Sequence, residues 1–249
     1  MKIWSNVTGQ LTYTVEQHTD IVQAVAFYDG DKAVISGGIS KQILINWIDS
    51  SKSESINSIR VGSLKVDDNT HLLYIIEAAG KKVICYNIPD KREIYRLEAR
   101  ENILSSALSS DGRYMLLNVS FMYPELQLWD LRERQVMRRY TGHAQERYYI
   151  KAIFGGHDQF FVASGSEDAI IYIWNKNTEV LINKLPGHTS MVNCIAWSPT
   201  DPSLLVSGSD DYTVKVWDSK NWKVEVVNDM NVKEDVGRNP DMEDMDDND

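Results

Sequence analysis

The chain has 249 residues, of which 43% are hydrophobic and 25% are charged, and its formal net charge is −10. This apolar fraction is enough to bury a sizeable core, so disorder throughout is excluded, and the length allows one or two ordinary domains. Two cysteines cannot form a disulfide scaffold, which indicates a reducing compartment such as the cytosol or nucleus. No apolar run is long enough to span a membrane, and we expect neither a membrane partner nor a signal peptide.

Most of the negative charge lies at the C-terminal end. Residues 228–249 contain nine acidic and two basic residues, a net charge of −7, whereas the other 227 residues carry only −3. The nearly neutral main part lacks the basic face that nucleic acid needs, so we expect no nucleic-acid partner. The terminal segment is poor in apolar residues and is expected to be disordered, either as a solubilising terminus or as an arm for a basic partner surface.

An aromatic residue closes a short apolar run at regular intervals along the chain. In chain order these residues are Trp4, Trp47, Tyr86, Trp129, Trp174 and Trp217, with spacings of 43, 39, 43, 45 and 43 residues. A period of about 40–45 residues with Gly-His early and Trp-Asp late is typical of a WD-repeat β-propeller, whose blades have four strands each. We therefore predict an all-β WD-repeat propeller over residues 1–227 and an acidic tail over residues 228–249.

The predicted blades begin with an incomplete one. Residues 1–4 and 10–16 supply only its outer half, and five complete units follow, ending at Trp47, Tyr86, Trp129, Trp174 and Trp217. Most rings of this type have seven blades, and an unfinished ring would leave backbone groups unpaired at a sheet edge. We expect the chain to be part of a larger ring and incomplete at its N-terminus, with a closed ring of five or six blades as the alternative.

The last two units show the strand pattern most clearly, because apolar residues alternate along them. In the first, strands are predicted at residues 150–154, 160–164, 170–174 and 180–185. In the second, they are predicted at residues 191–197, 204–208, 213–217 and 223–227. Cys85 and Cys194 fall within predicted strands, so we expect them to be buried core residues rather than nucleophiles.

Both of these units contain a histidine, a serine, an aspartate and a tryptophan at equivalent positions. The two sets, each predicted to form a buried structural hydrogen-bond network, are His143, Ser164, Asp168 and Trp174, and His188, Ser207, Asp211 and Trp217. A catalytic Ser-His-Asp triad is the alternative. Because the set recurs at the repeat period, and because buried polar groups must be paired in any case, we favour the structural role.

Large side chains on turns and loops are candidate contacts for protein partners, since aromatic, Met and Arg residues dominate interface energetics. The candidates are Lys41, Met122, Tyr123, Arg132, Arg147, Tyr148, Met191 and Tyr212. Each of them is also compatible with ordinary packing at the rim of a blade. The five histidines show no metal-ligand spacing, and neither Cys-x-x-Cys nor a phosphate-binding loop occurs. We therefore expect no catalytic residue, no metal, no cofactor and no small-molecule substrate.

Two segments carry a closer resemblance. The combination of Phe154-Gly-Gly-His157 with Ala163-Ser-Gly-Ser-Glu-Asp168, together with the unit that opens at Gly187-His188, resembles the WD-repeat subunit family of the GID/CTLH E3 ubiquitin ligase. That family also has N-terminal helical LisH, CTLH and CRA regions, which these 249 residues lack. The resemblance implies a non-catalytic scaffold that helps to assemble the ligase and present substrate proteins for proteasomal degradation. From the cysteine usage we expect it in the cytoplasm and also the nucleus.

A different ligase system is the alternative. Trp129-Asp-Leu-Arg132 resembles the motif with which some WD proteins dock onto the DDB adaptor of cullin ligases. The arginines at positions 132, 134, 138 and 139 are equally consistent with an edge strand that is protected by charge. The chain would then be a WD-repeat scaffold or substrate receptor of another complex, such as a cullin ligase or a signalling assembly.

Overall fold

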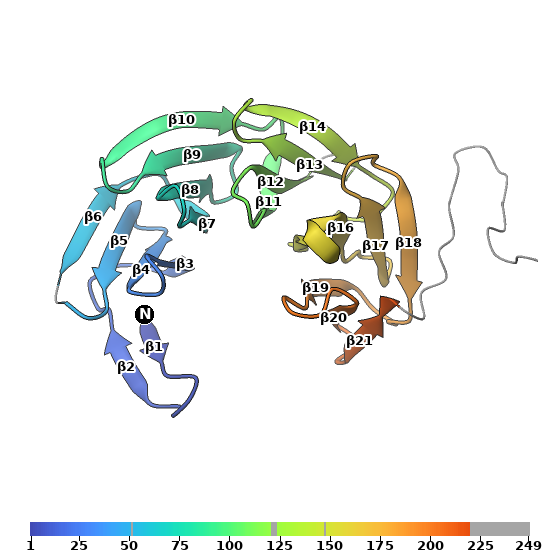
Figure 1. The fold of residues 1–249 in the computed structure, drawn as a ribbon, viewed down its shortest axis with the longest axis horizontal. Helices are drawn as coiled ribbons and strands as arrows, with labels where there is room; N and C mark the ends of the chain where they lie inside the picture. Colours follow the sequence, from blue (N-terminus) through green and yellow to red (C-terminus); the bar gives the residue numbers. More distant parts are fainter. Residues whose placement is uncertain (51, 121–123, 147, 220–249) are drawn as a thin grey trace, which may run out of the picture.

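The computed structural model describes residues 1–50, 52–120, 124–146 and 148–219. These residues fold into antiparallel sheets, each built from strands that are consecutive in sequence. Figure 1 shows the sheets side by side along an arc, with the first strand of each full sheet toward the centre and the last strand on the outside. The predicted all-β fold with propeller blades is confirmed.

The strands follow the predicted units closely. The N-terminal sheet is the pair β1 (Lys2–Trp4) and β2 (Leu11–Thr14). The next sheet contains β3 (Val22–Tyr28), β4 (Ala33–Gly38), β5 (Gln42–Trp47) and β6 (Ser53–Asn57). It is followed by β7 (Val61–Asp67), β8 (Leu72–Glu77), β9 (Lys82–Asn87) and β10 (Arg92–Glu98). The central sheet contains β11 (Asn102–Leu108), β12 (Tyr114–Ser120), β13 (Glu125–Asp130) and β14 (Gln135–Tyr140).

The two C-terminal sheets correspond to the units in which the strand pattern is clearest. The first contains β15 (Ala152–Gly155), β16 (Phe161–Ser164), β17 (Ile170–Asn175) and β18 (Leu181–Pro186), with a short 3-10 turn, η1 (His157–Gln159), after β15. The second contains β19 (Val192–Trp197), β20 (Leu204–Ser209) and β21 (Val214–Asp218). The predicted outer strand at residues 223–227 and the predicted tail at 228–249 lie outside the described residues.

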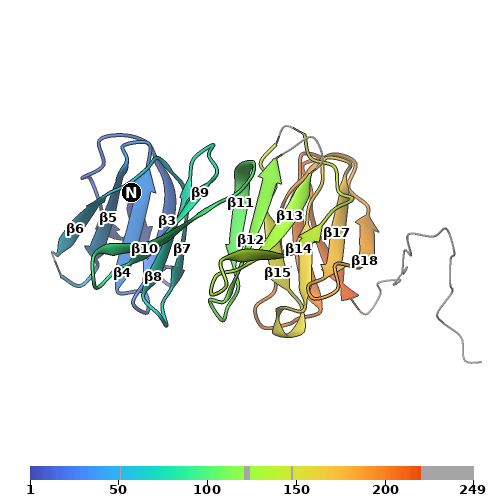
Figure 2. The ribbon, with the colours of Figure 1, turned by 90° about the horizontal axis from the view of Figure 1, so that it is seen from above.

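Strand direction gives the arc two different faces (Figure 2). In each four-stranded sheet, the connection between the second and third strands lies at the same end as the segments that join successive sheets. We call this side the connector face. The turns between the first two strands and between the last two strands lie on the opposite side, the hairpin face. Of the predicted partner-binding residues that the structure describes, all except Arg132 belong to the connector face.

Apolar cores hold neighbouring sheets together. Among the described residues, each pair of successive full sheets shares one cluster of buried aliphatic and aromatic side chains. Ile45, Tyr74, Leu126 and Ile173 are members of these four clusters in chain order. Complete burial of one such side chain stabilises the fold by about 1.5–3 kcal/mol, so the interfaces between sheets carry much of the stability.

Tyrosines add a repeated polar link between neighbouring sheets. The hydroxyl of Tyr95 on β10 donates to the carbonyl oxygen of Leu131 at 3.2 Å, and that of Tyr140 on β14 donates to the carbonyl oxygen of Lys176 at 2.6 Å. Both bonds join residues 36 positions apart. β10 and β14 are therefore each tied to a turn of the following sheet, at the edge farthest from the centre of the arc.

The arc is open between β1–β2 at one end and β19–β21 at the other (Figure 1). The last sheet accordingly has an uncovered apolar face, where Val206, Val214 and Val216 are 37%, 73% and 68% exposed. Cys194 lies on that face and is exposed, so its predicted burial is wrong, whereas Cys85 is buried as predicted. A β-bulge between Val192 and Cys194 shifts the alternation of β19, so that Val192 and Ile195 are the residues that face the core.

Candidate interaction face

The predicted polar set around His188 forms a complete hydrogen-bond network in the last sheet. His188 contacts Asp211 through Nδ1 at 2.8 Å and Ser207 through Nε2 at 2.7 Å, and the indole N–H of Trp217 donates to the same Ser207 hydroxyl at 2.8 Å. Gly187 precedes the histidine with a φ of +153°, and a Cβ at this position would lie 3.0 Å from the Trp217 ring. The glycine of the Gly-His pair is therefore needed for both the backbone geometry and the close packing.

The aspartate of this network is strongly stabilised in its charged form. The Thr213 hydroxyl donates to Asp211 and is the largest cause of a pKa held well below the usual range. Partial burial opposes this shift, while the N–H of Thr189 and the His188 ring reinforce it. Asp211 thus connects the turn before β21 to the loop before β19, which fixes the connector face of this sheet.

The same atoms have the connectivity of a Ser-His-Asp triad, but their surroundings do not suit nucleophilic catalysis. Ser207 is 1% exposed and His188 is 7% exposed, so a substrate carbonyl has no route to the hydroxyl. The Ser207 oxygen also accepts the bond from Trp217. The arrangement is able to lock a turn to a strand, whereas acyl transfer needs an accessible nucleophile and an oxyanion site.

The second predicted network, around His143, does not form. Both ring nitrogens of His143 are buried without a hydrogen-bond partner among the described residues. Trp174 donates instead to the Thr141 carbonyl oxygen at 3.2 Å, and Ser164 donates to the Gly165 carbonyl oxygen at 2.9 Å. His143 packs edge-on against Trp174, with ring centroids 5.7 Å apart. Burial lowers the pKa of His143 from 6.5 to about 4, with Asp168 and the nearby Gln145 side chain opposing that effect.

Asp168, the aspartate of this set, is hydrogen-bonded to other groups instead of His143. Asp168 accepts from the Tyr172 hydroxyl at 2.6 Å and from the Ile170 N–H at 3.2 Å. The physical reason lies in chain spacing: His143 precedes Ser164 by 21 residues, whereas His188 precedes Ser207 by 19. His143 also stands at the start of the long connector between β14 and β15, which is fastened by other residues.

Gln145 and Glu167 fasten that connector. The Gln145 amide accepts from Asn118 Nδ2 of β12 at 2.7 Å and donates to the Tyr148 carbonyl oxygen at 2.7 Å. Glu167 accepts from the backbone N–H groups of Glu146 and Tyr148 at 2.8 and 3.1 Å. Sequence reasoning missed these residues, since the only indication was the unusual length of the connector.

Sequence reasoning also missed a second histidine–serine pair. His18, in the segment that leads into β3, has its Nε2 2.7 Å from the hydroxyl of Ser36 on β4. The two residues are 18 positions apart, close to the 19 of His188 and Ser207. This spacing could have revealed the pair, although Gly-His is absent and the turn that would carry the aspartate contains Ser40-Lys41. This sheet thus has the histidine–serine contact of the network, while the position of the aspartate is taken by other residues.

The structure separates the predicted partner-binding residues into several groups. Lys41, Tyr148 and Tyr212 lie on the connector face and are exposed, with Tyr212 at 100%. Arg132 is exposed on the hairpin face, after β13. Met191 is only 9% exposed at the entrance to β19, so its prediction as a partner contact is wrong. The remaining predicted residues, Met122, Tyr123 and Arg147, lie outside the described residues.

The connector face also contains a cavity of about 420 Å³ at the seam between β7 and β11. Its wall includes Gln23, Arg60, Glu77, Leu104 and Tyr149. Tyr149 is 64% exposed and reaches this seam from the connector that Gln145 and Glu167 fasten. The cavity therefore combines a guanidinium, an aromatic ring and polar groups from three sheets, a composition suited to protein contacts.

The segment that resembles an adaptor-docking motif is partly used inside the fold. Burial alone would raise the pKa of Asp130, but hydrogen bonds from the Glu133 and Arg132 N–H groups and from Arg113 hold it below the usual range. Among the nearby arginines, Arg138 and Arg139 form ion pairs with Glu179 and Glu125. Arg132 is left as the exposed member of the motif.

Comparison with known proteins identifies the repeat. The family model described as "WD domain, G-beta repeat" matches residues 134–175 and 179–218. The chain is a WD-repeat protein. It is 31% identical over 218 residues to a "WD repeat-containing protein 26 homolog" of Arabidopsis thaliana, which covers 86% of this chain and 36% of that protein. A homolog of the same name from Drosophila melanogaster is 34% identical over 223 residues, covering 88% of this chain and 34% of that protein.

A further relative is named for a complex. "GID complex subunit 7" of Schizosaccharomyces pombe is 36% identical over 148 residues, which is 59% of the WD-repeat chain and 29% of that protein. The two homologs named above match most of this chain, and the chain spans about a third of their length. Within the described residues there is no helix long and apolar enough to cross a membrane. The described residues also contain no cluster of three or more His, Cys, Asp or Glu side chains placed to hold a metal ion.

Proposed function

We propose that this WD-repeat chain is a non-catalytic scaffold of a GID/CTLH-type E3 ubiquitin ligase, supporting its assembly and the presentation of substrate proteins for proteasomal degradation. The observation that carries this proposal is the 36% identity to the relative named GID complex subunit 7. The rigid arc supports it physically, because apolar cores between sheets and tyrosine links at their outer edges hold the turns in fixed positions. We place this activity in the cytoplasm and also in the nucleus.

The connector face is the proposed contact surface. Tyr148 and Tyr149 project from a connector whose backbone is fastened at Gln145 and Glu167, so little conformational entropy is lost when a partner binds them. Arg60 stands on the wall of the cavity that Tyr149 also lines. An aromatic residue and an arginine on a pre-organised surface are the residue types that dominate binding energy in protein interfaces.

Affinity purification of the tagged full chain from its own cells tests the proposal. We expect the RING-bearing subunits of the GID/CTLH complex to be enriched, as measured by quantitative mass spectrometry. The double variant Arg60→Glu/Tyr149→Ala should lower their recovery at least tenfold, whereas Arg92→Glu, at a 70% exposed side chain on the hairpin face, serves as a matched control. Equal thermal melting of the three proteins would show that the fold is retained. Absence of those subunits from the wild-type sample would refute the ligase role, and equal recovery by the double variant would refute the surface.

A different WD-repeat complex is the second candidate, supported by the exposed Arg132 in Trp129-Asp-Leu-Arg132. Recovery of a cullin and its DDB adaptor in place of GID/CTLH subunits, with loss of that recovery in Arg132→Glu, would favour this alternative. The variant changes an exposed turn residue on the hairpin face, so it should leave GID/CTLH recovery unchanged.

A further inference from the structure

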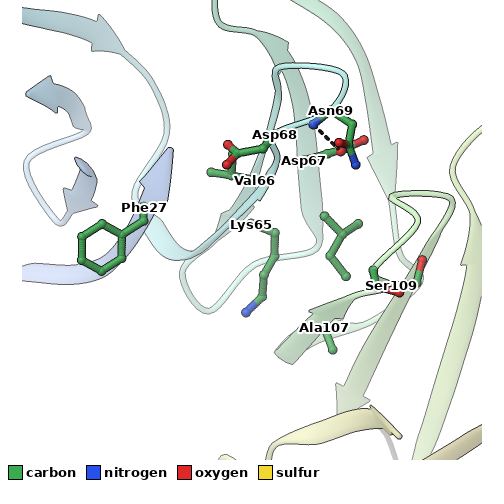
Figure 3. Close-up of a pocket in the computed structure, with 10 residues that line it drawn as sticks. Phe27, Lys65, Val66, Asp67, Asp68, Asn69, Ala107 and Ser109 are labelled. Atoms are coloured by element: carbon green, nitrogen blue, oxygen red, sulfur yellow. Dashed lines mark hydrogen bonds between the residues drawn. The ribbon is translucent and has the colours of Figure 1, made fainter. Parts of the chain in front are cut away.

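A second cavity, of about 480 Å³, lies at the same seam between β7 and β11 but on the hairpin face. Its wall includes Phe27, Lys65, Asp67, Asp68, Ala107 and Ser109. Figure 3 shows Lys65 pointing away from the turn that carries the two aspartates and into the space between Phe27 and Ala107. The cavity therefore has one cationic side chain directed into its interior.

Both aspartates in the wall of the cavity already accept hydrogen bonds from residues of nearby turns. Asp67 accepts from the Asn69 N–H at 3.1 Å and from the Thr70 hydroxyl at 2.5 Å. Asp68 accepts from the Asp29 and Gly30 N–H groups at 3.1 and 3.3 Å, which joins the turn after β7 to the turn after β3. These carboxylates fasten the hairpin face, and neither forms an ion pair with Lys65 within the part of the chain that the structure describes.

Lys65 is an uncompensated charge in a partly buried position. No ion pair or hydrogen bond of its ammonium group is found among the described residues, in contrast to Lys52, Lys81 and Lys91, which pair with glutamates. Burial lowers the pKa of Lys65, and the nearby cation Lys151 lowers it further. Leaving a buried charge unpaired costs stability, so a fold that retains one has a ready position for an anionic group.

The shape and charge of the cavity restrict the class of anion. Among the described residues that line the cavity, Lys65 is the only cationic one, and no arginine is present to offer the bidentate fork that often binds phosphate. Asp67 and Asp68 on the same wall disfavour a doubly charged group. Phe27, in the wall of the same cavity, is 54% exposed and offers an apolar surface. A carboxylate on a short aliphatic stem satisfies all three features.

We propose that the hairpin-face cavity binds an acidic side chain of an extended peptide segment, with Lys65 donating to its carboxylate and Phe27 packing against the aliphatic part. This inference does not rest on the ligase role, because it concerns the chemistry that any partner must present. It also assigns a second contact surface, on the face opposite the one proposed above.

Fluorescence anisotropy with the full chain and a fluorescein-labelled hexaglutamate peptide tests the site, with hexaglutamine as the neutral control peptide. We expect hexaglutamate to bind at least tenfold more tightly than hexaglutamine, and Lys65→Met to weaken its binding about tenfold or more. Lys65→Arg should stay within about threefold of wild type, and Lys82→Met should leave binding unchanged. Equal binding of the two peptides, or unchanged binding by Lys65→Met, would overturn the proposal.

Two further measurements separate binding from folding and carboxylate from phosphate. Because Lys65→Met removes an unpaired charge and keeps most of the apolar stem, its melting midpoint should rise, by about 2–4 °C. A fall in the midpoint would show that the ammonium group is part of the fold and would contradict the proposal. Inorganic phosphate should displace hexaglutamate no better than acetate does at equal ionic strength. Stronger displacement by phosphate would refute the carboxylate assignment.

Discussion

His143 provides the strongest test of the structure, because histidines at equivalent positions of two sheets have different environments. His188 is hydrogen-bonded to Asp211 and Ser207, whereas His143 has no such partner in the part of the chain that the structure describes. We consider the substitution His143→Phe, which replaces the buried imidazole by a ring without nitrogen atoms. His143 has no hydrogen-bond partner among the described residues and packs edge-on against Tyr172 and Trp174. The phenyl ring preserves those contacts and removes two buried polar atoms, so the variant should be at least as stable as wild type at pH 7.5.

The pH dependence of the unfolding free energy gives the size of the effect expected from His143. Burial lowers the pKa of His143 from 6.5 to about 4, so the unfolded chain binds more protons than the folded chain between these values. Stability contributed by the neutral ring is therefore present above pH 6.5 and is lost as the pH falls toward 4. The full difference corresponds to roughly 3 kcal/mol, of which roughly 2 kcal/mol is lost between pH 7.5 and pH 5.

Urea unfolding followed by tryptophan fluorescence at pH 7.5 and pH 5 measures this effect. The loss of unfolding free energy on acidification should be smaller in His143→Phe than in wild type by roughly 2 kcal/mol. Burial also lowers the pKa of His18, which is why the comparison between variants, rather than the wild-type slope alone, is decisive. His157→Gln, at an 83% exposed side chain, is measured in parallel as the control for loss of a surface histidine. Identical slopes for His143→Phe and wild type would refute the assignment of a buried, unpaired imidazole.

Two further substitutions test the contacts that fasten neighbouring strands and sheets. His188→Phe should destabilise the chain by roughly 2–4 kcal/mol in urea unfolding, because Ser207 and Asp211 lose a buried partner, and a neutral result would mean that the network is dispensable. Tyr140→Phe removes the bond to the Lys176 carbonyl oxygen and should cost about 1 kcal/mol, or about 2–4 °C in melting midpoint. An unchanged midpoint would indicate that this sheet-to-sheet link contributes nothing.

The architecture was predictable because it depends on periodic features. The aromatic residues at a spacing near 43 and the alternating apolar runs placed nearly all strands of the last two described sheets within one or two residues. Exposure was harder to predict, since alternation fixes which residues share a face but not what covers that face. Cys194 shows this: the β-bulge in β19 changes the alternation, and the last sheet has no described neighbour on its outer side.

Polar contacts depend on chain spacing at a finer scale than the repeat. His143 and His188 share the preceding glycine, the serine of the second strand and an aspartate six residues before the tryptophan, yet only His188 forms the network. A ring nitrogen must lie within about 3 Å of its partner, and two additional residues in a connector move it by more than that. Gln145, Asn118 and Glu167 then fasten the longer connector. The same difference in spacing that leaves His143 unpaired therefore positions Tyr148 and Tyr149 on the connector face, where the proposed partner binds.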